Sequence, residues 1–154
     1  KSLVNLFAVL SVVMAVLVLS DVSNAQPRRA RGKVYTKSEV NKIINNLETR
    51  VDKFKGDFDK SLDNSRLNGT DREDYLNKRA KDLEKATDEL RKEFDKRDLW
   101  IENKEEVRKC LNIAQDINTA MKNRKLGGTT ESNWAAVRYE LNTLAKIYNL
   151  PTVK

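Results

Sequence analysis

Apolar residues recur at steps of three and four along most of the chain from residue 36 onward. Such steps place the apolar side chains on one face of an α-helix and leave charged side chains on the other. The pattern predicts four amphipathic helices, over about residues 37–64, 71–97, 104–125 and 131–148. Their predicted core residues are Val40, Ile44, Leu47, Val51, Phe54 and Phe58; Leu76, Ala80, Leu83, Thr87, Leu90 and Phe94; Val107, Leu111, Ala114, Ile117 and Met121; and Trp134, Val137, Leu141, Leu144 and Tyr148.

Capping residues support the predicted helix starts. A threonine followed three residues later by glutamate forms a capping box, in which each side chain accepts a hydrogen bond from the other residue's backbone amide. Asparagine and serine are also favoured at this position. The candidate caps are Thr36 with Glu39, Thr70 with Glu73, Asn103 with Glu106, and either Thr130 or Ser132 for the last helix.

Four amphipathic helices with short connections favour an all-α fold, namely a four-helix antiparallel bundle over residues 36–150. Outside the apolar N-terminal run, no alternating series of β-branched residues predicts a strand. The short apolar seams also fit an elongated coiled-coil hairpin that dimerises. The pattern therefore leaves both a monomer and a homodimer open.

The N-terminal 25 residues have the order typical of a secretory signal peptide. Lys1 precedes an apolar run over residues 3–19, and the small residues of Ser23-Asn24-Ala25 follow it. The run also reaches the lower edge of the length of a membrane-spanning helix, about 17 to 25 residues, so a retained anchor is the alternative. We expect cleavage after Ala25, and a periplasmic or extracellular protein that meets a membrane only if this segment stays uncleaved.

Residues 26–35 form a basic segment. The chain has a formal net charge of +7, and Arg28, Arg29, Arg31 and Lys33 carry four positive charges within six residues. The segment lacks hydrophobic periodicity and repels itself, so we expect it to be disordered. Its four cations are candidate polyanion-binding residues, for lipid headgroups, cell-wall polymers or nucleic acid without sequence specificity. A solvated tail that aids solubility is the alternative.

The composition excludes several chemistries because the chain contains no histidine. Haem attachment, the di-iron sites of helical bundles and the usual Ser-His or Cys-His nucleophile pairs all require histidine. Asp57, Asp59, Ser61 and Asp63 have the alternate oxygen spacing of a calcium loop, but Leu62 occupies the position that needs glycine. We therefore predict no catalytic, metal-binding or cofactor-binding residue.

Aromatic residues and the single cysteine fit a packed core. We predict that Cys110 is a small core residue of the third helix. Phe54, Phe58, Trp134 and Tyr148 have core spacing, whereas Tyr75, Trp100 and Tyr139 lie off the apolar faces and are expected to be partly exposed.

Several segments of the chain resemble uncharacterised small secreted helical proteins of bacteria. The likeness rests on residues 47–54, 65–70 and 86–90, on Trp134 and on residues 144–149. The resemblance implies export and a helical fold, and it carries no assigned activity. Together these features predict an exported, non-enzymatic helical protein that binds an unknown protein or an anionic envelope polymer. A periplasmic chaperone or stress protein with an elongated helical hairpin is the alternative.

Overall fold

The computed structural model describes residues 28–30, 33–123 and 125–154. The predicted signal peptide lies outside the described residues. The predicted all-α character is confirmed, and the helices begin and end close to the expected positions. They are α1 (Lys37–Asp63), α2 (Asp71–Lys96), α3 (Lys104–Asn123) and α4 (Gly128–Ile147), with a single 3₁₀ turn, η1 (Trp100–Asn103), leading into α3.

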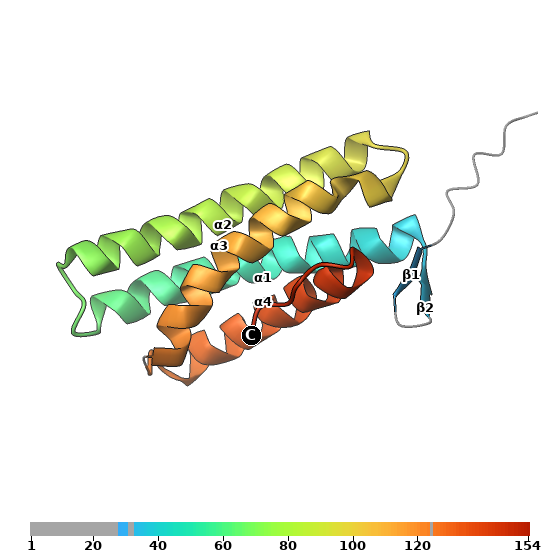
Figure 1. The fold of residues 1–154 in the computed structure, drawn as a ribbon. Coiled ribbons are helices and arrows are strands. Elements are labelled where there is room, and N and C mark those ends of the chain that lie inside the picture. The colour runs from blue at the N-terminus through green and yellow to red at the C-terminus, as the bar shows by residue number, and fades with distance from the viewer. Residues whose placement is uncertain (1–27, 31–32, 124) are drawn as a thin grey trace, which may run out of the picture.

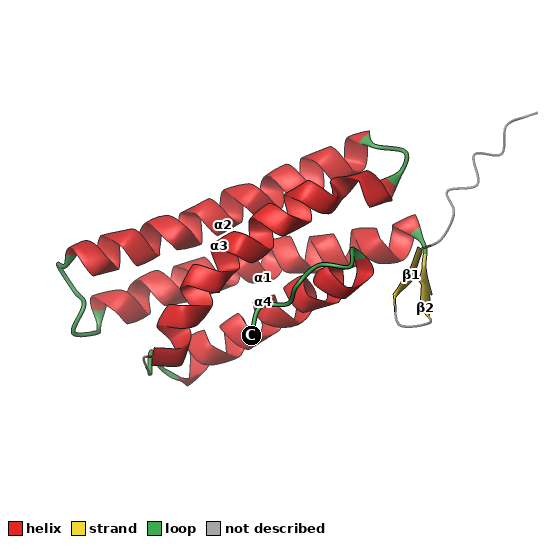
Figure 2. Cartoon of the chain, viewed as in Figure 1, coloured by secondary structure: helices red, strands yellow, loops and turns green. Residues whose placement is uncertain are grey.

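The helices form a bundle in which each one packs against its neighbours in the sequence. Helix α1 contacts α2 and α4, and α3 contacts α2 and α4, so α2 and α4 lie diagonally opposite each other. Consecutive helices run in opposite directions, as Figure 1 shows, and short loops join them (Figure 2). This arrangement follows from amphipathic helices that each bury one apolar face.

The predicted apolar faces meet in a single core. Phe54 stacks against Phe58 with ring centroids 4.9 Å apart, and its ring also lies 4.9 Å from that of Trp134. At the other end of the bundle, Trp100 and Tyr148 pack edge to face at 5.7 Å. Trp100 is therefore buried, at 2% exposure, and the expectation that it is partly exposed is wrong. Tyr75 and Tyr139 are exposed as expected.

Cys110 is fully buried and forms no disulfide, so its prediction as a core residue is confirmed. Burial raises the pKa of its thiol to about 12. The thiol therefore stays protonated at physiological pH and is unreactive in the folded protein.

Two of the four predicted caps are confirmed. Thr36 and Glu39 form the reciprocal capping box. Thr70 accepts a hydrogen bond from the Glu73 amide, while the Glu73 carboxylate accepts one from Gly69 instead of from Thr70. Gly69 has a φ of 76°, which glycine adopts without steric cost and which closes the turn between α1 and α2.

The other two predicted caps are wrong, because their side chains form hydrogen bonds elsewhere. Asn103 donates to the Trp100 carbonyl and accepts from Arg97, so its amide turns away from the start of α3. Helix α4 starts at Gly128, three residues before the predicted start at 131. The Thr130 hydroxyl bonds to Ser61 and to the Asp57 carbonyl, which ties the first turn of α4 to α1.

The expectation that residues 26–35 are disordered is wrong for the part that the structure describes. Strands β1 (Arg28–Ala30) and β2 (Lys33–Tyr35) pair as an antiparallel hairpin, with Arg29 opposite Val34. Two residues of β2, Val34 and Tyr35, favour extended backbone, and Tyr35 packs partly against the core. Strand β1 also contacts α4. These contacts offset the repulsion between the cations on which the prediction rested.

The residues after α4 fold back over the bundle. Asn149 has a φ of 53°, which reverses the chain, and Val153 is buried at 3% exposure. The Asn142 side chain holds the Val153 backbone from both sides, accepting from its amide at 2.8 Å and donating to its carbonyl at 3.0 Å. The tail thus packs between α3 and α4.

Candidate functional site

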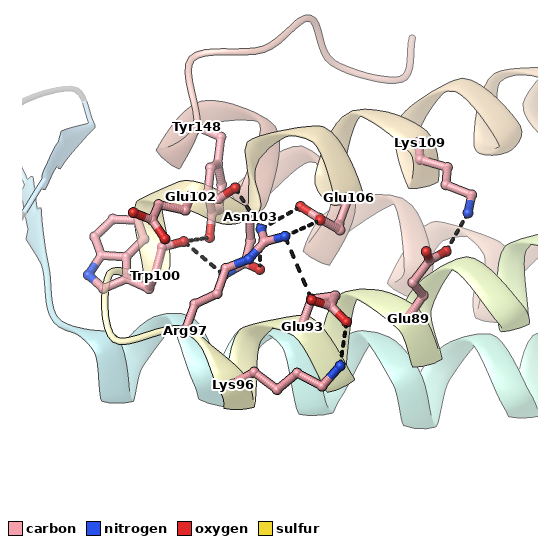
Figure 3. Close-up of polar contacts among 10 residues, drawn as sticks. All are labelled: Glu89, Glu93, Lys96, Arg97, Trp100, Glu102, Asn103, Glu106, Lys109 and Tyr148. Carbon is pink, nitrogen blue, oxygen red and sulfur yellow. Dashed lines mark hydrogen bonds and ion pairs between the residues drawn. The ribbon is translucent and has the colours of Figure 1, made fainter.

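The densest polar cluster lies at the corner between α2 and α3 (Figure 3). Arg97 donates to both carboxylate oxygens of Glu106, at 3.0 and 2.7 Å, and to Asn103 at 3.1 Å. The Tyr148 hydroxyl donates to the Trp100 carbonyl at 2.7 Å. Glu106 raises the pKa of Arg97. Because these groups satisfy one another, the cluster holds the corner in shape and leaves no group aimed at a ligand.

A buried carboxylate lies between α1 and α4. Glu140 is 3% exposed, pairs with Arg50 at 3.1 Å and accepts a hydrogen bond from Asn46. Burial raises the pKa of Glu140, and Arg50 opposes that effect only in part. The carboxylate joins two helices inside the bundle, so we assign it a structural role.

The residues with calcium-loop spacing lie within α1, as expected. Asp57 accepts a hydrogen bond from Asn133 at 2.6 Å, and the Ser61 hydroxyl bonds to Thr130. Within the described residues, no group of three or more acidic or cysteine side chains could hold a metal ion. No helix in the same part of the chain is long and apolar enough to cross a membrane.

Three hollows lie along α4 or just before its start, and we name them together the α4 groove. The first, of about 550 Å³, lies where the α1–α2 turn meets the α3–α4 loop. The second, of about 480 Å³, lies between the end of α3 and the first half of α4 and shares Lys125 with the first. The third, of about 290 Å³, follows the second half of α4 and shares Ala135 and Arg138 with the second. Each hollow therefore adjoins the next through shared lining residues.

Positive charge dominates the α4 groove. Within the described residues, none of its six cations is part of an ion pair, and Glu131 is the one carboxylate residue that lines it. Serine, threonine and asparagine side chains also line the groove, and most of them donate hydrogen bonds to carbonyl groups of the protein. The groove cations are Lys60, Arg66, Lys122, Lys125, Arg138 and Lys146.

The wall of the second hollow combines apolar side chains with a buried hydrogen-bond network. Trp134 and Met121 supply its apolar surface. The side-chain oxygen of buried Asn118 accepts hydrogen bonds from the Trp134 indole and from Nη1 of Arg138, each at 3.1 Å. The Asn118 amide nitrogen donates to the carbonyl of Lys154. This network fixes the orientation of the Arg138 guanidinium.

The sequence-predicted polyanion-binding residues lie at the other end of α4. Figure 1 shows the β1–β2 hairpin beside the carboxyl end of this helix. Arg28, Arg29 and Lys33 belong to its strands, whereas Arg31 and the side chains of the other three lie outside the described residues. Helix α4 has 20 residues, so the hairpin lies about 30 Å from the first hollow.

The sequence pattern did not predict the groove cations as a site, because they come from separate parts of the sequence. Lys60 lies in the last turn of α1, Lys122 in the last turn of α3, and Arg138 within α4. One signal was present: Arg138, Asn142 and Lys146 follow one another at steps of four, which places polar side chains along one face of a helix.

Comparison with known proteins gives no matching family model, no similar curated protein and no similar solved structure. The resemblance to small secreted bacterial proteins therefore stays a prediction.

Proposed function

We propose that this protein is an exported, non-enzymatic binding protein whose α4 groove and basic hairpin hold an extended anionic polymer. The observation that carries the proposal is the line of groove cations, none of which is neutralised by an ion pair within the described residues. Unpaired cations in a concave surface concentrate the positive potential there and attract anionic partners.

The length of the groove favours a polymer over a small ion. Two of the hollows follow α4, which is about 30 Å long, the first lies just before this helix, and the β1–β2 hairpin lies beside its carboxyl end. Charges spread over such a distance reinforce one another only when the ligand is long enough to meet several of them. The exposed ring of Tyr139, which lines the third hollow, offers a stacking surface along the same groove.

The N-terminal segment supports export. Residues 1–25 carry the charged, apolar and small-residue order of a signal peptide. On this basis we propose a periplasmic or extracellular location, where the partner is an anionic envelope polymer. The N-terminal sequence and mass of the protein recovered from expressing cells test the location, because cleavage after Ala25 makes Gln26 the first residue.

Retention on immobilised heparin, a sulfated linear polyanion, tests the binding function. Replacing Lys122, Lys125 and Lys146 by alanine should lower the salt concentration needed for elution, because fewer cations then displace counterions from the polymer and the affinity depends less steeply on salt. Replacing the four cations of the basic segment at residues 26–35, Arg28, Arg29, Arg31 and Lys33, should act in the same direction.

A charge-matched control separates the groove from net charge. Lys81, Lys85 and Lys92 lie exposed on α2, diagonally opposite α4, and make no ion pair within the described residues. Their triple alanine variant has the same net charge as the groove variant and should elute close to the unmodified protein. Equal losses in the two variants would show that only overall charge matters and would overturn the groove as the site.

A further inference from the structure

Arg138 lies where two hollows of the α4 groove adjoin. It lines both the second and the third hollow, and its Nη1 is held by the buried side-chain oxygen of Asn118. Its Nε is buried and has no hydrogen-bond acceptor within the protein as described, and Nη2 has none there either. One edge of the guanidinium is thus fixed, and the Nε–Nη2 edge is left unsatisfied.

Nη2 is the group of Arg138 that a ligand can reach, because Nε is buried and Nη1 already bonds to Asn118. A charged N–H donor makes a stronger hydrogen bond to a carboxylate or phosphate oxygen than a neutral donor does. Asn118 is itself 1% exposed and bonded on both sides, so the guanidinium is already oriented before a ligand arrives.

The residues around Arg138 indicate the chemistry of the rest of the ligand. Met121, Trp134 and Ala135 supply apolar surface in the second hollow, while Lys122 and Lys125 lie at the same hollow. An oxyanion on an apolar or aromatic body fits both parts. We propose that Arg138 anchors one carboxylate or phosphate group of the ligand in the second hollow, with the attached apolar body against Met121 and Trp134. This inference rests on the proposed anion-binding function and names its anchoring subsite.

Phenyl phosphate, benzoate and the neutral analogue benzamide test the subsite. The chain has two tryptophans, and their indole N–H signals in ¹⁵N NMR spectra give an internal comparison. Trp134 belongs to the second hollow, whereas Trp100 lies in η1 at the opposite end of the bundle. We expect one or both anions to shift the Trp134 signal saturably and the Trp100 signal to stay in place. The relative affinities of the two anions then identify phosphate or carboxylate as the preferred group.

Arg138→Lys keeps the charge and removes the guanidinium that Asn118 orients, so it should weaken binding of the better anion about tenfold. As a second variant, Ala135→Leu fills the hollow from an exposed helix position and should also weaken binding. Ser132→Leu, also exposed on α4 but lining none of the three hollows, is its control. Unchanged affinity in Arg138→Lys, or equal binding of benzamide, would overturn the proposal.

The heparin experiment separates the failure of the proposed polymer binding from the failure of Arg138 as an anchor. If the groove binds polyanions but Arg138 is no anchor, the lysine triple variant loses heparin retention while Arg138→Lys binds phenyl phosphate and benzoate normally. If Arg138 is an anchor but no polymer follows the groove, the triple variant elutes with its α2 control while Arg138→Lys still weakens binding of the small anions.

Discussion

Among individual residues, Glu140 shows how a folded environment changes a charge. Its carboxylate is 3% exposed, and the pKa of Glu140 is raised because burial disfavours the charged form more than Arg50 and Asn46 favour it. A raised pKa in the folded state means that the folded protein holds this proton more tightly than the unfolded chain does. Glu140 therefore contributes its full stabilisation at pH values below its pKa in the unfolded chain. This contribution is lost as the pH rises through the pKa of Glu140 in the folded protein.

Glu140→Gln should remove that loss, because glutamine resembles the protonated carboxyl group. We expect the variant to match the unmodified protein near pH 4 and to exceed its free energy of unfolding at pH 7.5 by about 1 kcal/mol or less. Urea denaturation at both pH values measures the difference. Glu131→Gln, at an exposed position of the same helix, is the control and should show no such gain. A less stable Glu140→Gln at pH 7.5 would mean that the Arg50 ion pair outweighs burial.

At the scale of elements, the C-terminal tail depends on one side chain of α4. Asn142 makes both hydrogen bonds to the Val153 backbone, and Val153 is buried by packing near α3 and α4. Asn142→Ala leaves two backbone groups without their partner and should lower the free energy of unfolding by about 1–3 kcal/mol. Faster hydrogen exchange of the Val153 amide should accompany the loss.

Asn112→Ala provides the matched control for this prediction. Asn112 is exposed on α3, lines the same hollow beside the tail, and has no hydrogen bond to a described residue. Its replacement should leave both the unfolding curve and the exchange of Val153 unchanged. Slow exchange at Val153 in Asn142→Ala would show that apolar packing alone holds the tail.

The helices could be predicted because their signals are local. Steps of three and four residues and the Thr36 capping box act within one or two turns, and the structure follows them closely. The errors arise where distant segments meet. Thr130 bonds to α1 instead of capping α4, and the β1–β2 hairpin is supported by Tyr35 at the core. Asn103 is the exception, because it bonds within the α2–α3 corner. Spacing along the chain carries no information on such partners.

For the molecule as a whole, the candidate site depends on tertiary structure. The basic run at residues 28–33 is visible in the sequence, but the α4 groove combines Lys60, Lys125 and Arg138 from three elements that only folding brings together. The special property of Arg138, one edge held by Asn118 and the other unsatisfied, depends on a contact between α3 and α4. The sequence could thus indicate an anionic partner and could not locate the groove.

The bundle buries its apolar faces internally, which bears on its oligomeric state. The exposed large apolar or aromatic side chains among the described residues are Val34, Tyr75, Leu99, Ile101 and Tyr139, spread over β2, α2, the α2–α3 corner and α4. A stable dimer needs about 800 Å² of well-packed surface from each partner, which such scattered side chains do not supply. An elongated hairpin that dimerises would instead need a continuous apolar seam on its surface. The apolar faces of α1 and α2 are buried in the core of the bundle and are not available for such a seam.

We therefore expect the protein recovered from cells to be a monomer. Size-exclusion chromatography with light scattering should give the mass of one chain, unchanged over a hundredfold range of protein concentration. Adding heparin should raise the mass only in the form with intact Lys122, Lys125 and Lys146, because several chains can then share one polymer. A mass of two chains without heparin would favour the clasping dimer of the chaperone hypothesis, since that geometry needs a second chain to enclose its client.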